Sequence, residues 1–130
     1  MSDMMFREPN QVKWQGVRPG HNGKQVYWNT STFAIGELVI VPASATLRRF
    51  ITYYDMMLNP TGICIAQLRV YTDGDVLVWT FGHIRNIVNG TSGDKTGTFN
   101  PPFELPIGWY IVTSLSTGVS LETAILGWEE

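Results

Sequence analysis

The stretch CIAQLRVYTDGDVLVWTF, residues 64–81, decides the fold class. Apolar and polar side chains alternate through its first half, and β-branched and aromatic residues dominate its second half. A period of two is typical of a β-strand with one buried face. The central Asp-Gly pair suits a type I′ turn. The stretch therefore predicts two antiparallel strands, Ile63–Thr72 and Asp75–Phe81, joined at Asp73-Gly74.

The same rhythm continues on both sides of this hairpin, because turn residues recur about every ten positions between β-branched and aromatic runs. The pattern predicts a strand at Phe33–Val41, ended by Pro42, and a strand at His83–Val88 that begins at a Gly82 bulge. It also predicts that GWYIVTS (108–114) and VSLETAIL (119–126) pair with each other around residues 116–118. The expected fold is an all-β antiparallel sandwich, jelly-roll-like, with about eight strands.

One segment, TLRRFITYYDMML (46–58), fits two structures. Its apolar side chains fit one stripe of a helix, but they equally fit one face of a strand. The Ile, Thr, Phe and Tyr content and the following Asn-Pro-Thr-Gly turn favour the strand.

The amino-terminal residues differ from the rest. The segment FREPNQVKWQGVRPGHNGKQ (6–25) has two prolines, three glycines and no sustained period. We expect residues 1–30 to form an arm or linker that lies on a neighbour or is mobile, ahead of a sandwich domain at 31–130. We expect no signal peptide, because residues 1–11 contain no apolar core, and no membrane span, because no apolar run is long enough.

The composition favours a protein that contacts other proteins. The chain has 130 residues, a formal net charge of −2 and 15% charged residues, against about a quarter in an average soluble protein. Aromatic residues reach 12%, with five tryptophans. An acidic balance argues against nucleic-acid binding, and few charges with many aromatics predict a partly covered surface. A monomer with an uncharged polar surface is the alternative.

The stretch NGTSGDKTGTFNPP (89–102) contains the residue types of a phosphate-binding loop. The phosphate loop requires a glycine before the lysine and a helix after it. Asp94 precedes Lys95 here, and Pro101-Pro102 break a helix. We therefore expect no nucleotide site, and interpret residues 89–97 as a surface loop.

The residue types needed for catalysis are sparse. His21 and His83 are the only histidines, and neither accompanies a nucleophile motif. Asp73 and Asp75 fall on a turn, which we favour over a calcium site. The single cysteine, Cys64, falls on the apolar face of its strand and is expected in the core rather than as a nucleophile. The sequence predicts no catalytic residue, no cofactor and no metal.

The aromatic residues are the better candidates for recognition, because exposed aromatic rings anchor protein interfaces or stack on sugars. The alternative for each ring is a place in the core. The interface or ligand candidates are Trp14, Arg18, Tyr27, Trp28 and Trp128.

Three stretches resemble small β-sandwich virion proteins of tailed bacteriophages, which serve in head decoration, fibres, necks and tails. They are WQGVRPGHNGKQVYW (14–28), LVIVPASATLRRFITYY (38–54) and FNPPFELPIGWYIVTSLSTGVSLETAILGWEE (99–130). The resemblance implies a non-enzymatic structural component of a virion, made in the host bacterial cytoplasm. It implies as partners copies of the chain, with a trimer as one expected form, and other virion proteins.

Two other functions stay open. A glycan- or receptor-binding module at a virion tip would use exposed tryptophan and tyrosine rings against host-surface glycans. A small jelly-roll enzyme would need a concave pocket with a perturbed carboxylate or histidine. Neither nucleic acid nor a membrane is expected as a partner.

Overall fold

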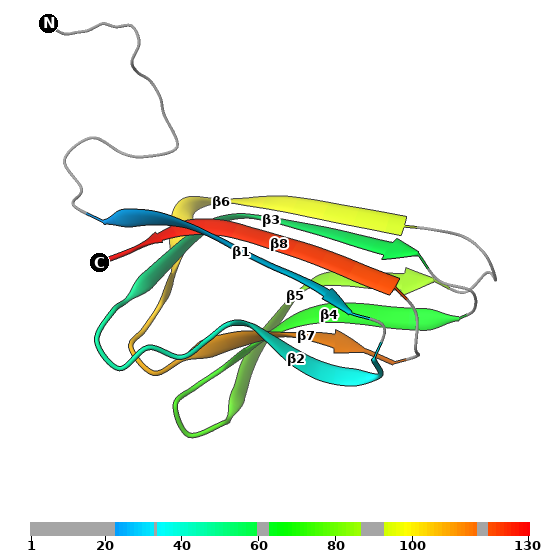
Figure 1. Ribbon diagram of the computed structural model, residues 1–130, viewed down its shortest axis with the longest axis horizontal. Coiled ribbons are helices and arrows are strands. Elements are labelled where there is room, and N and C mark those ends of the chain that lie inside the picture. The colour runs from blue at the N-terminus through cyan, green and yellow to red at the C-terminus, as the bar shows by residue number, and fades with distance from the viewer. Residues whose placement is uncertain (1–22, 33, 60–62, 87–92, 117–119) are drawn as a thin grey trace, which may run out of the picture.

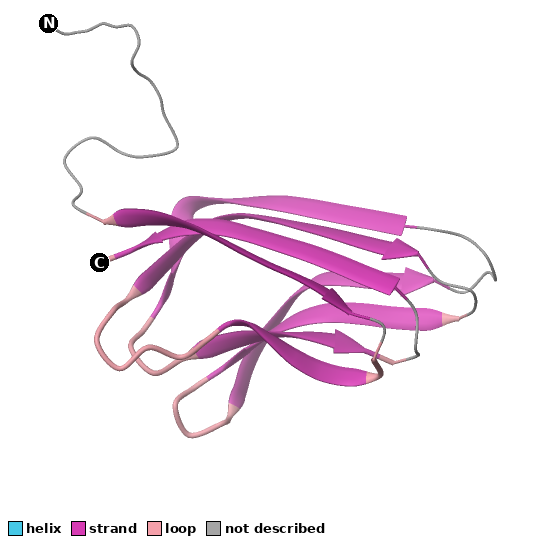
Figure 2. Ribbon diagram, in the orientation of Figure 1, coloured by secondary structure: helices cyan, strands magenta, loops and turns pink. Residues whose placement is uncertain are grey.

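The computed structural model describes residues 23–32, 34–59, 63–86, 93–116 and 120–130. These residues form eight β-strands in two layers (Figure 1), joined by loops and turns (Figure 2). The predicted all-β sandwich of about eight strands is therefore confirmed. The strands are β1 (Lys24–Thr32), β2 (Gly36–Val41), β3 (Arg49–Asn59), β4 (Cys64–Tyr71), β5 (Leu77–Asn86), β6 (Gly93–Leu105), β7 (Tyr110–Leu115) and β8 (Ser120–Glu129).

The strands form two four-stranded sheets, which we call sheet A, in the order β1-β8-β3-β6, and sheet B, in the order β2-β7-β4-β5. Each strand pairs in antiparallel fashion with the strand equally far from the β4–β5 turn: β4 with β5, β3 with β6, β2 with β7, and β1 with β8. The described chain is thus one long hairpin rolled into two layers, which is the jelly-roll arrangement.

The predicted pairing of the last two strands is wrong. β7 lies between β2 and β4 in sheet B, whereas β8 lies between β1 and β3 in sheet A. Consecutive strands often pair, and the turn residues between these two favoured a hairpin. In the roll, the chain instead crosses to the other sheet between them, so each strand pairs with segments far away in sequence.

The core lies between the sheets and follows the alternation predicted from the sequence. In β4, Cys64, Ala66, Leu68 and Val70 are fully buried while the side chains between them are half-buried. Cys64 is therefore a core residue, as expected. Full burial of one such aliphatic side chain stabilises the fold by about 1.5–3 kcal/mol.

The ambiguous segment is a strand, β3, as predicted. It pairs with β6 along one edge and β8 along the other, so hydrogen bonds on both sides stabilise the extended form.

The first residue of β3, Arg49, is 1% exposed. The guanidinium donates hydrogen bonds to the carbonyl oxygens of Pro42 at 2.5 Å and Trp109 at 2.6 Å. Burial lowers the pKa of Arg49, and these two carbonyls offset the cost of desolvation.

The turn between β4 and β5 is not the predicted type I′ turn. Asp75 takes the left-handed conformation, with φ at 62°, instead of Gly74. The Asp75 amide donates to the Thr72 carbonyl at 3.0 Å, and the Thr72 amide donates to the Val76 carbonyl at 2.9 Å. A three-residue hairpin loop with its last residue left-handed has this pattern, and aspartate tolerates that conformation better than most residues.

β5 is continuous, so the prediction of a separate strand starting at His83 is wrong. The bulge predicted at Gly82 is present: Gly82 has φ at 61°, and the register with β4 shifts between the partners Leu68–Phe81 and Ala66–Ile84. Residues 87 and 88 lie outside the described residues. A bulge bends a strand without ending it, which the sequence pattern could not distinguish from a break.

The loop predicted around residues 89–97 is a strand from Gly93 onward. β6 is an edge strand of sheet A, where prolines are tolerated because one side needs no backbone donor. Pro101 and Pro102 fall within the register shift opposite Ile51 and Tyr53. The glycine and proline composition predicted a loop because it ignores the pairing supplied by β3.

The sandwich begins before the expected boundary at residue 31, since β1 places residues 24–30 in sheet A. Residues 1–22 of the predicted arm lie outside the described residues, as does Phe33, and β2 starts at Gly36 rather than at residue 33.

Within the described ranges, no helix could span a membrane. In that same part of the chain, no three acidic, histidine or cysteine side chains gather as metal ligands do.

Candidate functional site

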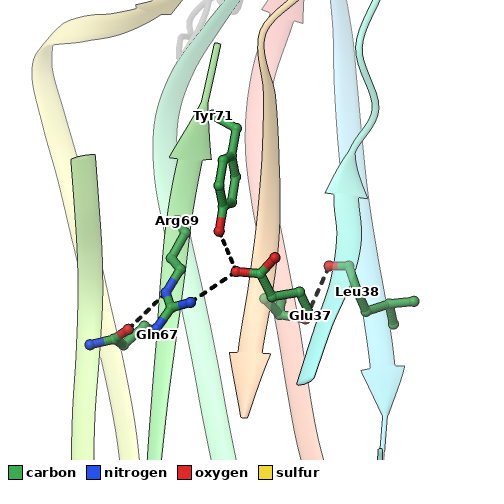
Figure 3. Close-up of polar contacts among 6 residues, drawn as sticks. Glu37, Leu38, Gln67, Arg69 and Tyr71 are labelled. Atoms are coloured by element: carbon green, nitrogen blue, oxygen red, sulfur yellow. Dashed lines mark hydrogen bonds and ion pairs between the residues drawn. The ribbon is translucent and has the colours of Figure 1, made fainter. Parts of the chain in front are cut away.

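The outer face of sheet B carries a chain of polar side chains that crosses from β2 to β4 (Figure 3). Glu37 in β2 accepts a hydrogen bond from Arg69 Nη1 at 2.9 Å and another from the Tyr71 hydroxyl. Both donors lie in β4, beyond β7. The hydrogen bond to Glu37 raises the pKa of Arg69 and also that of Tyr71. These bonds connect strands that are not direct neighbours.

The chain continues from Arg69 to β5. Arg69 Nε donates to Gln67 Oε1 at 3.0 Å, and Gln67 Nε2 lies 3.0 Å from His83 Nδ1. Arginine has only donors, so the amide oxygen of Gln67 must face Arg69 and the amide nitrogen must face His83. Nδ1 of His83 is then the acceptor, and the ring hydrogen sits on Nε2. His83 thus presents a donor to solvent at the edge of sheet B.

A second contact ties the β4–β5 turn to β7. The Tyr110 ring stacks on Tyr71 with centroids 5.4 Å apart, and its hydroxyl donates to Asp75 Oδ1 at 2.6 Å. The hydrogen bond to Asp75 raises the pKa of Tyr110 to about 12. Tyr71 and Tyr110 are therefore protonated donors near neutral pH, which suits a structural role and not a nucleophilic one.

An exposed apolar segment begins one residue before β5; we call it the β5 edge and define it as Val76–Trp79. Its four side chains are 59%, 46%, 46% and 40% exposed, the longest consecutive run of exposed large hydrophobic residues in the described chain. β5 pairs with β4 on one side, and no described strand pairs with its other side. An edge strand of this kind has backbone donors and acceptors open to another chain.

Trp79 is held in place although it is partly exposed. Its ring stacks on Phe81 with centroids 5.0 Å apart. It forms T-shaped contacts with Phe99 and Phe103 in β6, with centroids 5.8 and 5.0 Å apart. These rings fill the opening between the edges of the two sheets. Sequence reasoning missed Trp79 as a surface residue. The uncharged run Val76–Gly82 was the signal that could have found it.

The structure describes three of the five predicted recognition residues, namely Tyr27, Trp28 and Trp128. Trp14 and Arg18 lie outside the described residues. Tyr27 is 58% exposed on β1, as an interface candidate should be. Trp28 packs against the core, and Trp128 is 7% exposed, so both serve packing.

The buried position of Trp128 has a clear cause. Its ring stacks on Phe50 with centroids 5.0 Å apart, and its Nε1 donates to Glu130 Oε2 at 3.0 Å. Arg48 lies over the other ring of this stack, 5.4 Å from the centroid of Phe50.

Sheet A has depressions on its outer face. One of about 250 Å³ lies beside Tyr27, Leu126 and Trp128. Another of about 400 Å³ is lined by residues that include Met57, Asp94 and Glu122. Tyr27, Met57 and Glu122 also line a third, of about 270 Å³, which links the other two along the sheet.

Comparisons with known proteins found little. No family model matches the chain, and no curated protein matches it. Among solved structures, a chain of infectious bursal disease virus, Gt strain, is 12% identical with a TM-score of 0.36, covering 91% of this chain and 37% of that one. A chain of the Gx strain is 11% identical with a TM-score of 0.37, covering 88% and 36%. The present chain thus spans little more than a third of the length of those viral chains.

Proposed function

We propose that the protein is a non-enzymatic structural component of a phage virion, acting in capsid decoration, in a fibre or as a neck or tail connector. It assembles through its amino-terminal arm and the surface of its sandwich. The observation that carries the proposal is the β5 edge, four consecutive exposed apolar side chains at the start of a strand that pairs with a described strand on one side only. Soluble monomers rarely leave such segments uncovered, because they promote association.

Two further features support an assembly role. Charged residues are 15% of the chain, so much of the surface can be covered without burying charge. The polar network on sheet B uses its tyrosine, arginine and glutamate side chains to brace strands against one another. A folded unit with one edge that favours association suits an assembly in which symmetry repeats the same modest interface many times.

The proposal is tested by quantitative mass spectrometry of purified particles from a culture that produces the chain. We expect the protein in many copies per particle, in a fixed ratio to the other particle proteins. Its absence from washed particles, while the free protein is abundant in the lysate, would contradict the proposal.

A second candidate, a glycan- or receptor-binding module, is favoured by the surroundings of Tyr27. This ring is exposed beside a depression, and aromatic rings next to hydrogen-bonding side chains bind sugars. A glycan array separates the candidates: binding that is lost in Tyr27→Ala but kept in Ile107→Ala, which changes an exposed residue elsewhere, supports the module. An array without signal rejects it.

A further inference from the structure

We infer that the outer face of sheet A binds an unbranched, neutral polysaccharide chain that lies along β8. The inference rests on the second candidate function, the glycan-binding module, and names its site and its class of ligand. The three depressions on this face follow one another along β8, from Trp128 through Ala124 to Ser120. We call them together the sheet A groove. A strand rises about 3.3 Å per residue, so the groove is about 26 Å long between Ser120 and Trp128.

Ala124 forms the floor of the sheet A groove at its centre. In the register of sheet A it lies between Asn29 of β1 and Asp55 of β3, and all three line the same depression. Along β8, the nearest side chains on the same face are Glu122 and Leu126, which are larger and exposed. One short side chain among longer ones leaves the hollow.

The polar side chains around this floor are available to a ligand. The groove is lined by the carboxylates of Asp55, Asp94 and Glu122 and by the amides of Asn29 and Asn59. Within the described part of the chain, none of these five side chains has a hydrogen-bond or ion-pair partner. The outer face of sheet B differs, because its polar side chains bond to one another. The unused hydrogen-bonding capacity of the sandwich therefore gathers on sheet A.

The charge of the groove determines the class of ligand. Its three carboxylates accept hydrogen bonds and donate none, and no basic side chain is among the described residues that line the three depressions. A ligand must therefore supply donors and carry no negative charge. The hydroxyl groups of a neutral sugar meet both conditions, whereas uronic acids and sulfated sugars would face like charges. At one end of the groove, the exposed Tyr27 ring offers a face on which a sugar ring stacks.

A basic peptide would also satisfy the carboxylates, but the groove suits a sugar chain better. The strands beneath it, β8 and β3, each pair with a neighbour on both sides, so their backbone donors and acceptors are occupied. A peptide could not join the sheet here as an added strand, and its own backbone groups would lack partners. A sugar chain has no backbone amides to satisfy.

Filling the groove tests the site. Ala124→Leu places a larger side chain on the floor and removes no hydrogen-bonding group. Thr98→Leu is the matched control, because Thr98 is exposed on β6 of the same sheet and is not among the residues that line the three depressions. A triple variant, Asp55→Asn with Asp94→Asn and Glu122→Gln, keeps the shape of the groove and removes its charge. Circular dichroism and urea unfolding confirm that each variant is folded.

The full chain is applied to an array of unbranched neutral, uronic-acid and sulfated oligosaccharides, from disaccharide to octasaccharide, with an octalysine peptide beside them. Calorimetry then measures the affinity for the neutral oligosaccharide that binds best. We expect wild type to bind neutral chains more tightly as they lengthen and to leave the acidic chains unbound. Ala124→Leu should weaken binding at least about tenfold, and Thr98→Leu should match wild type. The triple variant should bind neutral chains more weakly and acidic chains more tightly than wild type does.

Three results would overturn the inference. Neutral binding that is lost in Tyr27→Ala but unaffected by Ala124→Leu and by the triple variant rejects the groove and keeps the glycan-binding module. Preferential binding of acidic chains rejects the class of ligand. An array on which no oligosaccharide binds, with or without binding of octalysine, rejects both the groove and the module. The virion proposal is decided separately, by the particle test.

Discussion

Gly97 in β6 faces the ring of Tyr54 in β3 so closely that a Cβ at position 97 would lie 2.7 Å from the Tyr54 Cζ. The two residues are register partners in sheet A. Tyr54 in turn meets Phe81 edge to face, with centroids 5.2 Å apart, so its ring cannot easily move away. Glycine at 97 is thus a packing requirement of a strand, although in the sequence it resembles a loop residue.

We therefore predict that Gly97→Ala lowers the free energy of unfolding by about 1–3 kcal/mol, the usual cost of overpacking a core. Gly93→Ala is the matched control on the same strand, because its Cβ would lie 3.6 Å from the nearest atom, Ile84 Cγ2. Urea denaturation of both variants measures the difference. Equal stabilities of the two variants would contradict the packing seen around Tyr54.

Arg49 and Arg48 are neighbours in sequence with opposite surroundings. Arg49→Lys should destabilise the fold by about 2–4 kcal/mol, because one ammonium cannot reach the two carbonyls that the buried guanidinium bridges. Arg48→Lys should change stability by less than about 0.5 kcal/mol, since its ion pair with Glu104 is half-exposed. Thermal and urea unfolding check both. An Arg49→Lys variant as stable as wild type would show that the hydrogen bonds to the Pro42 and Trp109 carbonyls do not stabilise the fold.

The Tyr110–Asp75 hydrogen bond predicts a pH dependence. The pKa of Tyr110 is raised from 10.0 to about 12, so the folded state holds the phenolic proton more tightly than the unfolded state. The stabilisation is complete below pH 10.0 and is lost as the pH rises toward about 12. In Asp75→Gly, which keeps the turn, ultraviolet titration should show one tyrosine ionising nearer its ordinary pKa. An unchanged titration curve would reject this bond.

Trp128 and Tyr27 allow a residue that packs in the fold to be compared with an exposed candidate for recognition. Trp128→Ala should destabilise the fold by about 3–5 kcal/mol, because it removes a buried ring stacked on Phe50. Tyr27→Ala should change stability by less than about 0.5 kcal/mol, because the side chain is 58% exposed. Comparing their urea midpoints checks the pair. A larger loss of stability in Tyr27→Ala than in Trp128→Ala would contradict the buried position of Trp128.

Local alternation was enough to predict the strands whose burial follows a period of two. β4 and β8 have this period, and the strand at residues 46–58 was chosen correctly over a helix from its β-branched content. What local pattern could not provide was pairing between distant segments. β6 became a strand because β3 pairs with it, and β7 and β8 separated because the roll places them in different sheets.

Surface aromatics were the hardest feature to predict. Trp79 and Trp128 lie in similar apolar strands, yet the first borders the opening between the sheets and the second is covered by a stack. Exposure here depends on whether the ring lies on an edge strand or under a neighbouring ring, and no local period encodes that. The left-handed Asp75 was missed for a related reason, because Gly74 beside it is the more usual residue for that conformation.

The most direct test of an assembly role is the mass of the full chain in solution by light scattering across concentrations. We predict a self-associating species, a dimer or a larger closed form, that dissociates toward the 14.6 kDa chain on dilution. A constant monomer mass up to the solubility limit would contradict the account.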